Sequence, residues 1–356
     1  MAQQSLAVKY RPKDFDDVTE QGAIKVILQQ QIKSGNIRNA YLFCGGAGTG
    51  KTTCARILAD RLNDGAGNPI ELDAASHNSV DDIRDIAQRA KTAALDGEYK
   101  VFILDEVHAL SGSAWQAMLK ILEEPPKRTV FIMCTTDPQK IPKTILSRVQ
   151  RYDFQRISKD GIYSRLVSIL NKEYPSEIGQ NDIGIPVERE ALDYIAKIAD
   201  GGMRDAITML DKCLAYRPEL TISNVLTVLG TASYPTMFRL ARTLLCGDSA
   251  EMIDIVEEIH YSGKDLKQFI KTFMQFALDL NKYECTGKMG ATDLPSTCEL
   301  DIQDLRGVVG KSYSEGILDL LNALVKLNAE IKWETAPKSV IEASFVLFCA
   351  DSRKEG

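Results

Sequence analysis

Hydrophobic and polar positions in the first 155 residues alternate between short apolar runs and longer stretches with helical periodicity. Short apolar runs bounded by turn residues predict buried strands, whereas apolar residues spaced three and four apart predict amphipathic helices. Strands that alternate with helices are typical of a parallel α/β sheet. The predicted strands are Ala40–Cys44, Pro69–Leu72, Tyr99–Leu104 and Thr129–Thr135, and the predicted helices between them are Thr52–Leu62, Val80–Ala94 and Ser113–Leu122.

From about Ser158 onward the sequence shows helical periodicity and no convincing strand. Gly and Pro residues separate the helical stretches, and a break around Gly230–Pro235 divides them into two groups. We therefore expect an α/β domain at residues 1–157, a helical domain at 158–230 and a second helical domain at 231–356. The expected helices are Asp160–Glu173, Arg189–Ala199, Met203–Leu214, Ile222–Leu229, Thr236–Leu245, Ala250–Tyr261, Asp265–Tyr283, Tyr313–Ala329 and Val340–Cys349.

The composition of the 356 residues is that of a folded, non-membrane protein. Hydrophobic residues make up 44% of the chain, which excludes a disordered chain. The longest apolar runs, such as Val130–Cys134, are far shorter than the roughly 20 residues that a membrane-spanning helix needs. The N-terminus lacks the basic start and apolar core of a signal peptide, so we expect a soluble, cytoplasmic protein without a membrane partner.

Eight cysteines and three histidines make it necessary to test for a metal site. No two cysteines form a Cys-x-x-Cys pair, and no histidine lies at ligand spacing from a cysteine. Several cysteines lie in apolar runs, where a free thiol packs as a small core residue. The spacing therefore predicts reduced structural thiols rather than a zinc site or a disulfide framework.

The formal net charge of −6 argues against a protein that coats nucleic acid through bulk electrostatics. The charge is unevenly distributed, since residues 1–60 and 120–175 are locally basic and residues 241–356 are acidic. Solvated surface explains the two basic stretches adequately, and a localised nucleic-acid face remains compatible with them.

The strongest motif is a glycine-rich segment at residues 45–52 that fits the pattern G-x-x-x-x-G-K-[ST]. It follows the apolar strand ending at Cys44 and begins a predicted helix, which is the context that a phosphate-binding P-loop requires. Glycines let backbone N–H groups approach phosphates, Lys51 can neutralise β- and γ-phosphate oxygens, and Thr52 can ligate Mg²⁺. A glycine-rich turn that carries Lys-Thr by chance is the alternative, and both flanking elements count against it.

Two carboxylates, Asp105 and Glu106, directly follow the apolar run Val101–Leu104. The carboxyl end of a parallel strand is where α/β sheets bind their ligands. Asp105 is therefore expected to join the Mg²⁺ shell, and Glu106 to orient and deprotonate an attacking water. A polar strand end is the simpler interpretation, but the position 54 residues after Lys51 favours the catalytic one.

Three further residues are candidates for contacts with a nucleotide. Thr136 (or Thr135) ends another buried strand, where it can sense a γ-phosphate or simply terminate the strand. Arg148 fits an arginine finger that enters a neighbouring subunit's site, with a surface salt bridge as the alternative. Arg204 lies in the first turn of a helix, where the helix dipole disfavours a cation, so an anionic ligand is a reasonable explanation.

Together these motifs resemble those of the AAA+ ATPases, and within them the clamp-loader branch, nearest to the gamma/tau subunits of bacterial DNA polymerase III. The resemblance covers residues 5–215, and the last third of the chain is similar only in being helical. The segments that carry it are Leu6–Pro12, Phe15, Val18, Gly45–Thr53, Asp73–Ser76, Leu104–His108, Leu119–Pro126, Thr135–Pro142, Ile145–Arg148 and Gly202–Ala206.

The resemblance implies roles for the residues that match its motifs. Thr136 corresponds to sensor 1, Arg148 to the trans-acting finger and Arg204 to sensor 2, alongside Lys51 and Glu106 as catalytic residues. Thr52 and Asp105 are the implied Mg²⁺ ligands. The implied ATP-binding residues are Ala7, Tyr10, Arg11, Pro12 and Val18 at the adenine and ribose end, and Gly45, Gly46, Ala47, Gly48, Thr49, Gly50, Lys51, Thr52 and Thr53 at the phosphates.

The resemblance also implies an assembly and its partners. These are a pentamer of this and other clamp-loader subunits joined by a helical collar, a ring-shaped sliding clamp, and primed DNA. ATP binding is expected to open the clamp and hydrolysis to release it during DNA replication. Helix N-termini near Asn78–Ser79 and Ser111–Ser113 are expected to contact DNA phosphates, which needs no high net positive charge.

Two departures from the family pattern qualify these expectations. The interval Asn63–Asn68 is too short for the family's four-cysteine zinc module, so we expect no zinc and a divergent, phage- or prophage-type subunit. Val149 replaces the usual cysteine after Arg148, which the finger should tolerate. The chain stops at Gly356 without a Pro-rich linker, so direct tethering of a polymerase or helicase is not expected.

Two alternatives remain for the function. One is another AAA+ DNA motor, such as a branch-migration helicase, and the other is a clamp-loader scaffold subunit that does not hydrolyse ATP.

Overall fold

In a computed structural model, the chain folds into two compact units, residues 1–214 and residues 215–356. The boundary predicted at residues 230–231 lies outside the described residues, and the three domain limits stay predictions. The structure describes residues 4–66, 68–92, 97–176, 183–229, 234–263, 265–292, 294–295 and 298–352.

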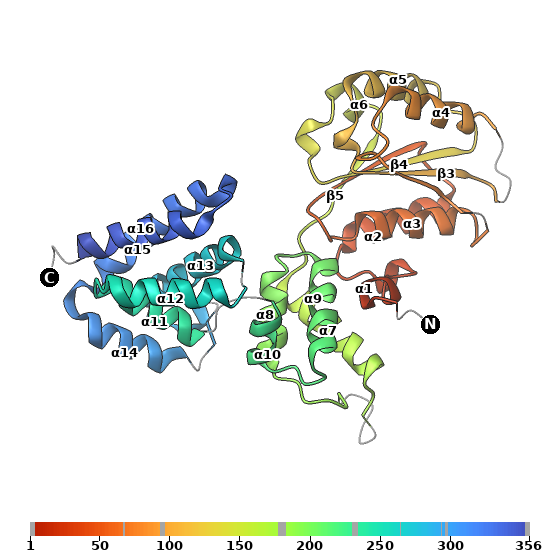
Figure 1. Cartoon of the computed structure of the whole chain (residues 1–356). Coiled ribbons are helices and arrows are strands. Elements are labelled where there is room, and N and C mark those ends of the chain that lie inside the picture. The colour runs from red at the N-terminus through yellow and green to blue at the C-terminus, as the bar shows by residue number, and fades with distance from the viewer. Residues whose placement is uncertain are drawn as a thin grey trace. The chain divides into compact units, whose positions relative to one another are not determined.

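A five-stranded parallel sheet forms the centre of the first unit, with strand order β2-β3-β4-β1-β5 (Figure 1). The α/β class and all four predicted strands are confirmed. The fifth strand was not predicted, because it is a short edge strand with one neighbour and only Tyr152 of its four residues is buried. The strands are β1 (Ala40–Cys44), β2 (Ile70–Asp73), β3 (Lys100–Asp105), β4 (Thr129–Thr135) and β5 (Gln150–Asp153).

Helices cover both faces of this sheet, so the central strands are buried on each side (Figure 1). On one face, α2 (Gly22–Ser34) and α3 (Lys51–Leu62) pack against strand residues such as Phe43. On the other face, α4 (Val80–Ala90) and α5 (Gly112–Glu123) pack against a second set of strand residues. Burial on both faces explains why the strands are continuous apolar runs instead of alternating ones.

Hydrophobic periodicity misplaced the end of one helix and missed another helix. The helix predicted to reach Ala94 ends at Ala90, where Lys100 Nζ donates to the carbonyl of Arg89 (2.6 Å), and residues 93–94 lie outside the described residues. Helix α2 was not predicted, because it begins after Gln21, which has a left-handed backbone, and carries no Ser, Thr, Asp or Asn cap.

The short helix α6 (Lys143–Leu146) lies between β4 and β5 along the chain, and three further helices of the first unit form a lid over the P-loop edge of the sheet. Ser158 accepts a hydrogen bond from the backbone of Gly161 and thereby caps α7. The N-terminal segment also contacts the lid, since the backbone N–H of Leu6 donates to Asp211 (3.1 Å). The lid helices are α7 (Lys159–Glu173), α8 (Arg189–Ile198) and α9 (Met203–Tyr216), and the short N-terminal elements are α1 (Leu6–Lys9) and the 3-10 turn Phe15–Asp17.

The connection between sheet and lid is held by two consecutive residues with left-handed backbones, Glu20 and Gln21. Gln21 is buried, and its side-chain amide donates to the carbonyl of Gln155 (2.7 Å) and accepts the N–H of the same residue (3.2 Å). Glu20 accepts hydrogen bonds from the backbone and hydroxyl of Ser158 at the start of α7. These contacts fix the chain where it leaves the sheet and enters the lid.

Replacing Gln21 by alanine is expected to lower the free energy of unfolding by about 2 kcal/mol, because it removes the two hydrogen bonds that the buried Gln21 side chain makes with the backbone of Gln155, at about 1 kcal/mol each. Urea-induced unfolding followed by circular dichroism measures the change. Gln30→Ala, at an exposed position of the same helix, should stay within about 0.5 kcal/mol of the unmodified protein. Equal losses for the two variants would show that the Gln21 amide contributes nothing specific.

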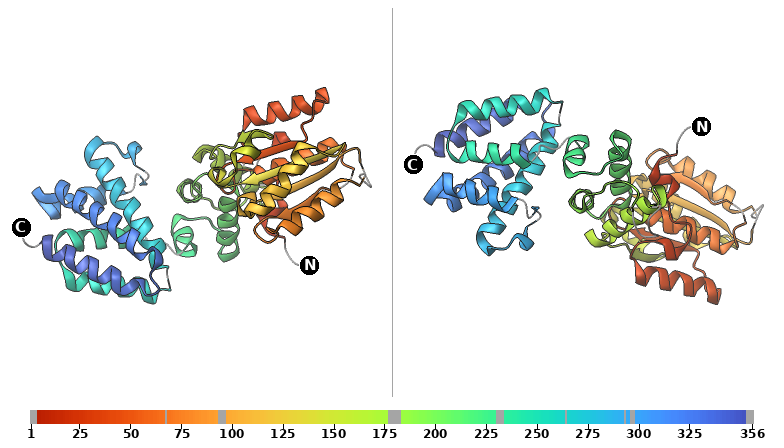
Figure 2. Two further views of the ribbon diagram at one scale, coloured as in Figure 1. Left: turned by 90° about the horizontal axis from the view of Figure 1, so that it is seen from above. Right: turned by 90° about the horizontal axis from the view of Figure 1, so that it is seen from below.

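The second unit is helical throughout its described part, as expected (Figure 2). Its centre contains Phe273, whose ring contacts Phe269 and Phe345 at centroid distances of 5.8 and 6.4 Å. Within the described residues of the whole chain, no helix has the length and apolar character to cross a membrane. The helices are α10 (Ile222–Val228), α11 (Tyr234–Leu245), α12 (Ser249–Tyr261), α13 (Leu266–Thr286), α14 (Glu299–Val309), α15 (Tyr313–Glu330) and α16 (Pro337–Ser352).

Candidate functional site

The glycine-rich segment forms a tight loop between β1 and α3. Gly45 and Gly48 have positive φ angles of 150° and 69°, which L side chains rarely adopt. A Cβ on Gly48 would lie 2.9 Å from the Cα of Gly202, so only glycine permits the lid to approach this closely. The backbone N–H of Met203 then donates to the carbonyl of Gly48 (3.0 Å), which joins the loop directly to the start of α9.

Lys51 is a buried cation at the first position of α3, with a relative exposure of 6%. Its ammonium donates to the carbonyls of Gly45 (2.9 Å) and Gly46 (2.7 Å). Burial lowers the pKa of Lys51, since desolvation disfavours the charged form. The two backbone carbonyls accept two of the three ammonium protons without neutralising its charge, so the loop suits an anion such as a polyphosphate.

Thr52 and Asp105 lie side by side at the carboxyl end of the sheet. The Thr52 hydroxyl donates to Oδ2 of Asp105 (2.7 Å), although the two residues belong to α3 and β3. A hydroxyl and a carboxylate in contact are hard oxygen ligands of the kind that Mg²⁺ prefers. Their positions therefore fit a shared Mg²⁺ next to the buried ammonium of Lys51.

Glu106 follows Asp105 with a left-handed backbone (φ 48°) and is held by the end of β4. Its Oε2 accepts hydrogen bonds from the hydroxyl (2.8 Å) and the backbone N–H (3.2 Å) of Thr136. Nδ1 of His108 lies 3.2 Å from the same oxygen. The structure thus brings Thr136 to Glu106, so the polar residues that follow β3 and β4 meet at one edge of the sheet.

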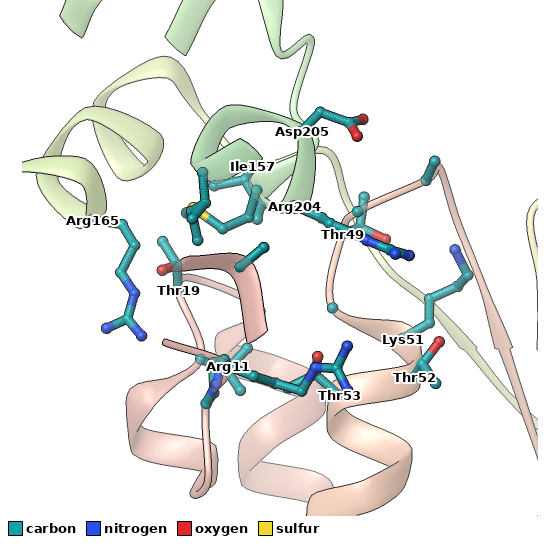
Figure 3. A pocket seen from close by; sticks show the side chains of 18 of the residues that line it. Arg11, Thr19, Thr49, Lys51, Thr52, Thr53, Ile157, Arg165, Arg204 and Asp205 are labelled. Carbon is teal, nitrogen blue, oxygen red and sulfur yellow. The ribbon is translucent and has the colours of Figure 1, made fainter. Parts of the chain in front are cut away.

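One cavity of about 300 Å³ joins the P-loop, the two carboxylates, the N-terminal segment and the lid (Figure 3). All five residues expected at the adenine end line it. Gly45 and Gly46 form the loop without lining the cavity, and neither Thr136 nor Arg148 is among the described lining residues. Its lining is Ala7, Tyr10, Arg11, Pro12, Val18, Thr19, Ala47, Gly48, Thr49, Gly50, Lys51, Thr52, Thr53, Asp105, Glu106, Ile157, Arg165, Met203, Arg204, Asp205 and Ile207.

Several lining residues were not predicted, and most of them come from the lid. Arg165 of α7 donates to the carbonyl of Tyr10 (2.9 Å), and Figure 3 shows Arg204 of α9 on the side of the cavity opposite Arg11. Burial, together with a hydrogen bond to Glu173, raises the pKa of Tyr10 to about 12, so its hydroxyl stays protonated at neutral pH. No local motif marks Arg165, because its contact joins segments 155 residues apart.

Arg148 lies outside the cavity of its own chain and makes an exposed ion pair. Its guanidinium donates to Oε1 of Glu123 (2.8 Å) and to the carbonyl of Thr144 (2.8 Å). The two charged side chains are 36% and 51% exposed. An ion pair of this exposure contributes about 0–1 kcal/mol, so Arg148 can exchange Glu123 for another anion at little cost.

The two helix N-termini expected to contact DNA are adjacent in the structure. The backbone N–H of Ser111, the residue that caps α5, donates to the carbonyl of Asn78 (3.2 Å). Asn78 directly precedes Ser79, the residue that caps α4. At α4, Asp82 completes a capping box with Ser79 and places a carboxylate at the helix start. This carboxylate weakens the attraction of the α4 terminus for a phosphate, so α5 is the better candidate.

Three protein families of DNA polymerase III match successive parts of the chain. Residues 65–158 match the family described as DNA polymerase III, delta subunit. Residues 162–217 match the ATPase lid domain of the DNA polymerase III clamp loader subunit, and residues 220–306 match domain III of subunits gamma and tau. The three matches follow the order of the sheet, the lid and the C-terminal helices.

Curated relatives with similar sequences are named as tau subunits of DNA polymerase III. DNA polymerase III subunit tau of Bacillus subtilis is 33% identical over 99% of this chain, which spans 64% of that protein. The Escherichia coli subunit tau is 34% identical over 74% of this chain and 43% of its own length. Among solved structures, the Thermotoga maritima RuvB Holliday junction branch migration motor is 18% identical with a TM-score of 0.51. The matched region covers 66% of this chain and 79% of the RuvB chain. At 18% identity the likeness concerns the fold alone.

Proposed function

Because the chain belongs to the gamma/tau clamp-loader subunits of DNA polymerase III, which are AAA+ proteins, we propose that it is an ATP-driven motor subunit of a clamp loader. In this proposal ATP binding opens a sliding clamp and hydrolysis releases it on primed DNA. The observation that carries the proposal is the meeting of Lys51, Asp105 and Glu106 at one end of a single cavity.

The phosphate end of the cavity accounts for ATP binding and hydrolysis. The P-loop backbone and Lys51 would bind the β- and γ-phosphates, because a buried ammonium needs an anionic partner. Bound Mg²⁺, held by Thr52 and Asp105, would supply neutralisation of the phosphate charge. Glu106 would accept the proton of the attacking water, which it can do as a cavity-lining carboxylate.

The other end of the cavity suits a purine base and couples it to the lid. Pro12 and Val18 offer apolar surface for a base, and Ala7 and Tyr10 belong to the segment that contacts the lid. Arg204 would report the phosphates to α9, whose first residue is already bonded to Gly48. ATP binding would thereby favour one orientation of the lid relative to the sheet.

In this proposal Arg148 acts on the γ-phosphate of an adjoining subunit within a pentamer that the C-terminal helices hold together. An accessible arginine with an exchangeable ion pair is what such a role needs. The other expected partners are further clamp-loader subunits, the sliding clamp and primed DNA. The absence of zinc, inferred from the cysteine spacing, stays a prediction.

The Arg148 role makes a specific prediction for assemblies that contain two or more copies of this chain. Arg148→Ala should lower kcat at least about 10-fold and leave ATP affinity unchanged, because the finger stabilises charge only in the transition state. Lys143→Ala, at an exposed position of the preceding short helix, is the matched control and should stay near the wild-type rate.

Mixing an impaired variant with an inactive one tests whether the arginine acts between chains. A mixture of Arg148→Ala and Lys51→Ala chains should hydrolyse ATP faster than either variant alone, because some sites then combine an intact Lys51 with a neighbour's intact Arg148. A mixture no faster than its components would contradict action between subunits.

ATP turnover with and without primed DNA and a sliding clamp tests the proposed function as a whole. A clamp-loader motor should hydrolyse ATP faster when both are present. Basal hydrolysis indifferent to both additions would favour another AAA+ DNA motor, and no hydrolysis under any condition would favour a scaffold subunit.

A further inference from the structure

His108 contacts Glu106 directly and has no part in the roles described so far. Its Nδ1 lies 3.2 Å from Oε2 of Glu106 and 3.2 Å from the hydroxyl of Thr135. His108 lies in the short 3-10 turn Val107–Ala109, which Val107 anchors by packing fully buried in the core. The chain and the Thr135 hydroxyl therefore fix the imidazole ring from two sides.

The contacts to Glu106 converge on one of its two carboxylate oxygens. Thr136 donates to Oε2 through its hydroxyl and its backbone N–H, and Nδ1 of His108 faces the same atom. Glu106 also lines the cavity that would hold the phosphates. Because a carboxylate accepts hydrogen bonds at both oxygens, Oε1 is the atom to which a water in the cavity can donate.

We propose that His108 is a positioning residue for ATP hydrolysis, which holds Oε2 of Glu106 so that Oε1 receives the proton of the attacking water. This inference rests on the proposed function, since it takes Glu106 as the group that deprotonates water. With its proton on Nδ1, the ring donates to Oε2 and fixes rotation of the carboxylate. A base that is held in its productive orientation occupies that rotamer in a larger fraction of the molecules, and this raises kcat.

Thr135 supports this arrangement from inside the sheet. It is fully buried at the end of β4, and its hydroxyl accepts the N–H of Asp137 (3.1 Å) while contacting Nδ1 of His108. The hydroxyl oxygen is thus held by the backbone, and it lies where it can share the Nδ1 proton with Oε2 of Glu106, which restricts rotation of the ring. Three consecutive contacts, from Asp137 through Thr135 and His108, end at the catalytic carboxylate of Glu106.

A purely structural role explains these contacts less well. The side chains of His108 and Glu106 are 22% and 36% exposed, and a polar contact between two partly exposed side chains contributes little to the free energy of unfolding. The contact therefore has more effect on the orientation of Glu106 than on stability.

The position of the ring nitrogen gives a sharp test with two amide substitutions. In His108→Asn the side-chain amide lies near the position of Nδ1, whereas in His108→Gln it lies near that of Nε2. We expect His108→Ala and His108→Gln to lower kcat about 10-fold with KM within about twofold, and His108→Asn to retain most of the wild-type kcat. His260→Ala, at an exposed position of α12, is the histidine control and should leave both constants unchanged.

The outcomes separate this inference from the proposed function. If wild type hydrolyses ATP and all His108 variants match it, or if His108→Ala is faster, the positioning role is overturned and the motor function stands. Equal losses in the Asn and Gln variants, with unchanged thermal unfolding midpoints, also overturn the role, because the position of the nitrogen then has no effect. Wild-type protein no faster than Lys51→Ala overturns the proposed function and this inference together.

Discussion

Replacing Lys51 by alanine is expected to weaken ATP binding about 100-fold and to abolish measurable hydrolysis. Lys51 is buried, and its ammonium is held by the carbonyls of Gly45 and Gly46, which do not neutralise its charge. Phosphate oxygens would supply the missing negative charge through charge-assisted hydrogen bonds. At the lower end of their usual range, about 1.5 kcal/mol each, two such bonds contribute about 3 kcal/mol, which corresponds to a loss of about 100-fold in affinity.

Isothermal titration calorimetry with a slowly hydrolysed ATP analogue measures this affinity. Lys33→Ala, an exposed lysine of α2, is the matched control and should bind as wild type. Thermal unfolding in the presence of the ATP analogue should also separate the two variants, because a ligand that binds only the folded state raises the unfolding midpoint more when it binds more tightly. Wild-type affinity in Lys51→Ala would show that the cavity does not bind the phosphates at the P-loop.

Replacing Glu106 by glutamine is expected to lower kcat at least about 100-fold and leave ATP affinity within about threefold. The substitution keeps the size of the side chain and one oxygen for the contacts from Thr136, so the site should keep its shape. It removes the basic oxygen that accepts the proton of water, and general base catalysis of this kind contributes about 100- to 10,000-fold.

Single-turnover hydrolysis and equilibrium binding, measured on the same preparation, check both halves of this prediction. Glu98→Gln removes a more exposed carboxylate elsewhere on the same unit and should change neither quantity. If Glu106→Gln loses affinity as strongly as Lys51→Ala, Glu106 maintains the binding site and is not the base. Full activity of the variant would exclude Glu106 from the chemistry altogether.

The sequence predicted those parts of the site that depend on consecutive residues. The P-loop and its helix form one continuous strand–loop–helix segment, so the spacing of Gly45 to Thr52 already implies their geometry. Asp105 and Glu106 follow a buried apolar run, and parallel strands place such ends at one edge of the sheet. The contact between Thr52 and Asp105 follows from these two local patterns together.

Prediction was weaker where an element lacks a local signal. Strand β5 has one buried side chain in four, and it is a strand because β1 offers a free edge. Helix α2 begins after a left-handed Gln21 that is held by Gln155, more than 130 residues away in sequence. Neither feature is visible in a window of neighbouring residues, because the stabilising partner is far along the chain.

The sequence by itself determined the parallel α/β sheet, the phosphate-binding loop and the identity of its charged residues, because each depends on residues that are neighbours along the chain. Only the tertiary structure decided that Arg165 closes on Tyr10, that Gly48 is bonded to Met203, and that Thr136 and His108 hold Glu106. All but one of these contacts join segments far apart in sequence. Such contacts depend on strand order and lid placement, which the burial of side chains throughout the unit determines.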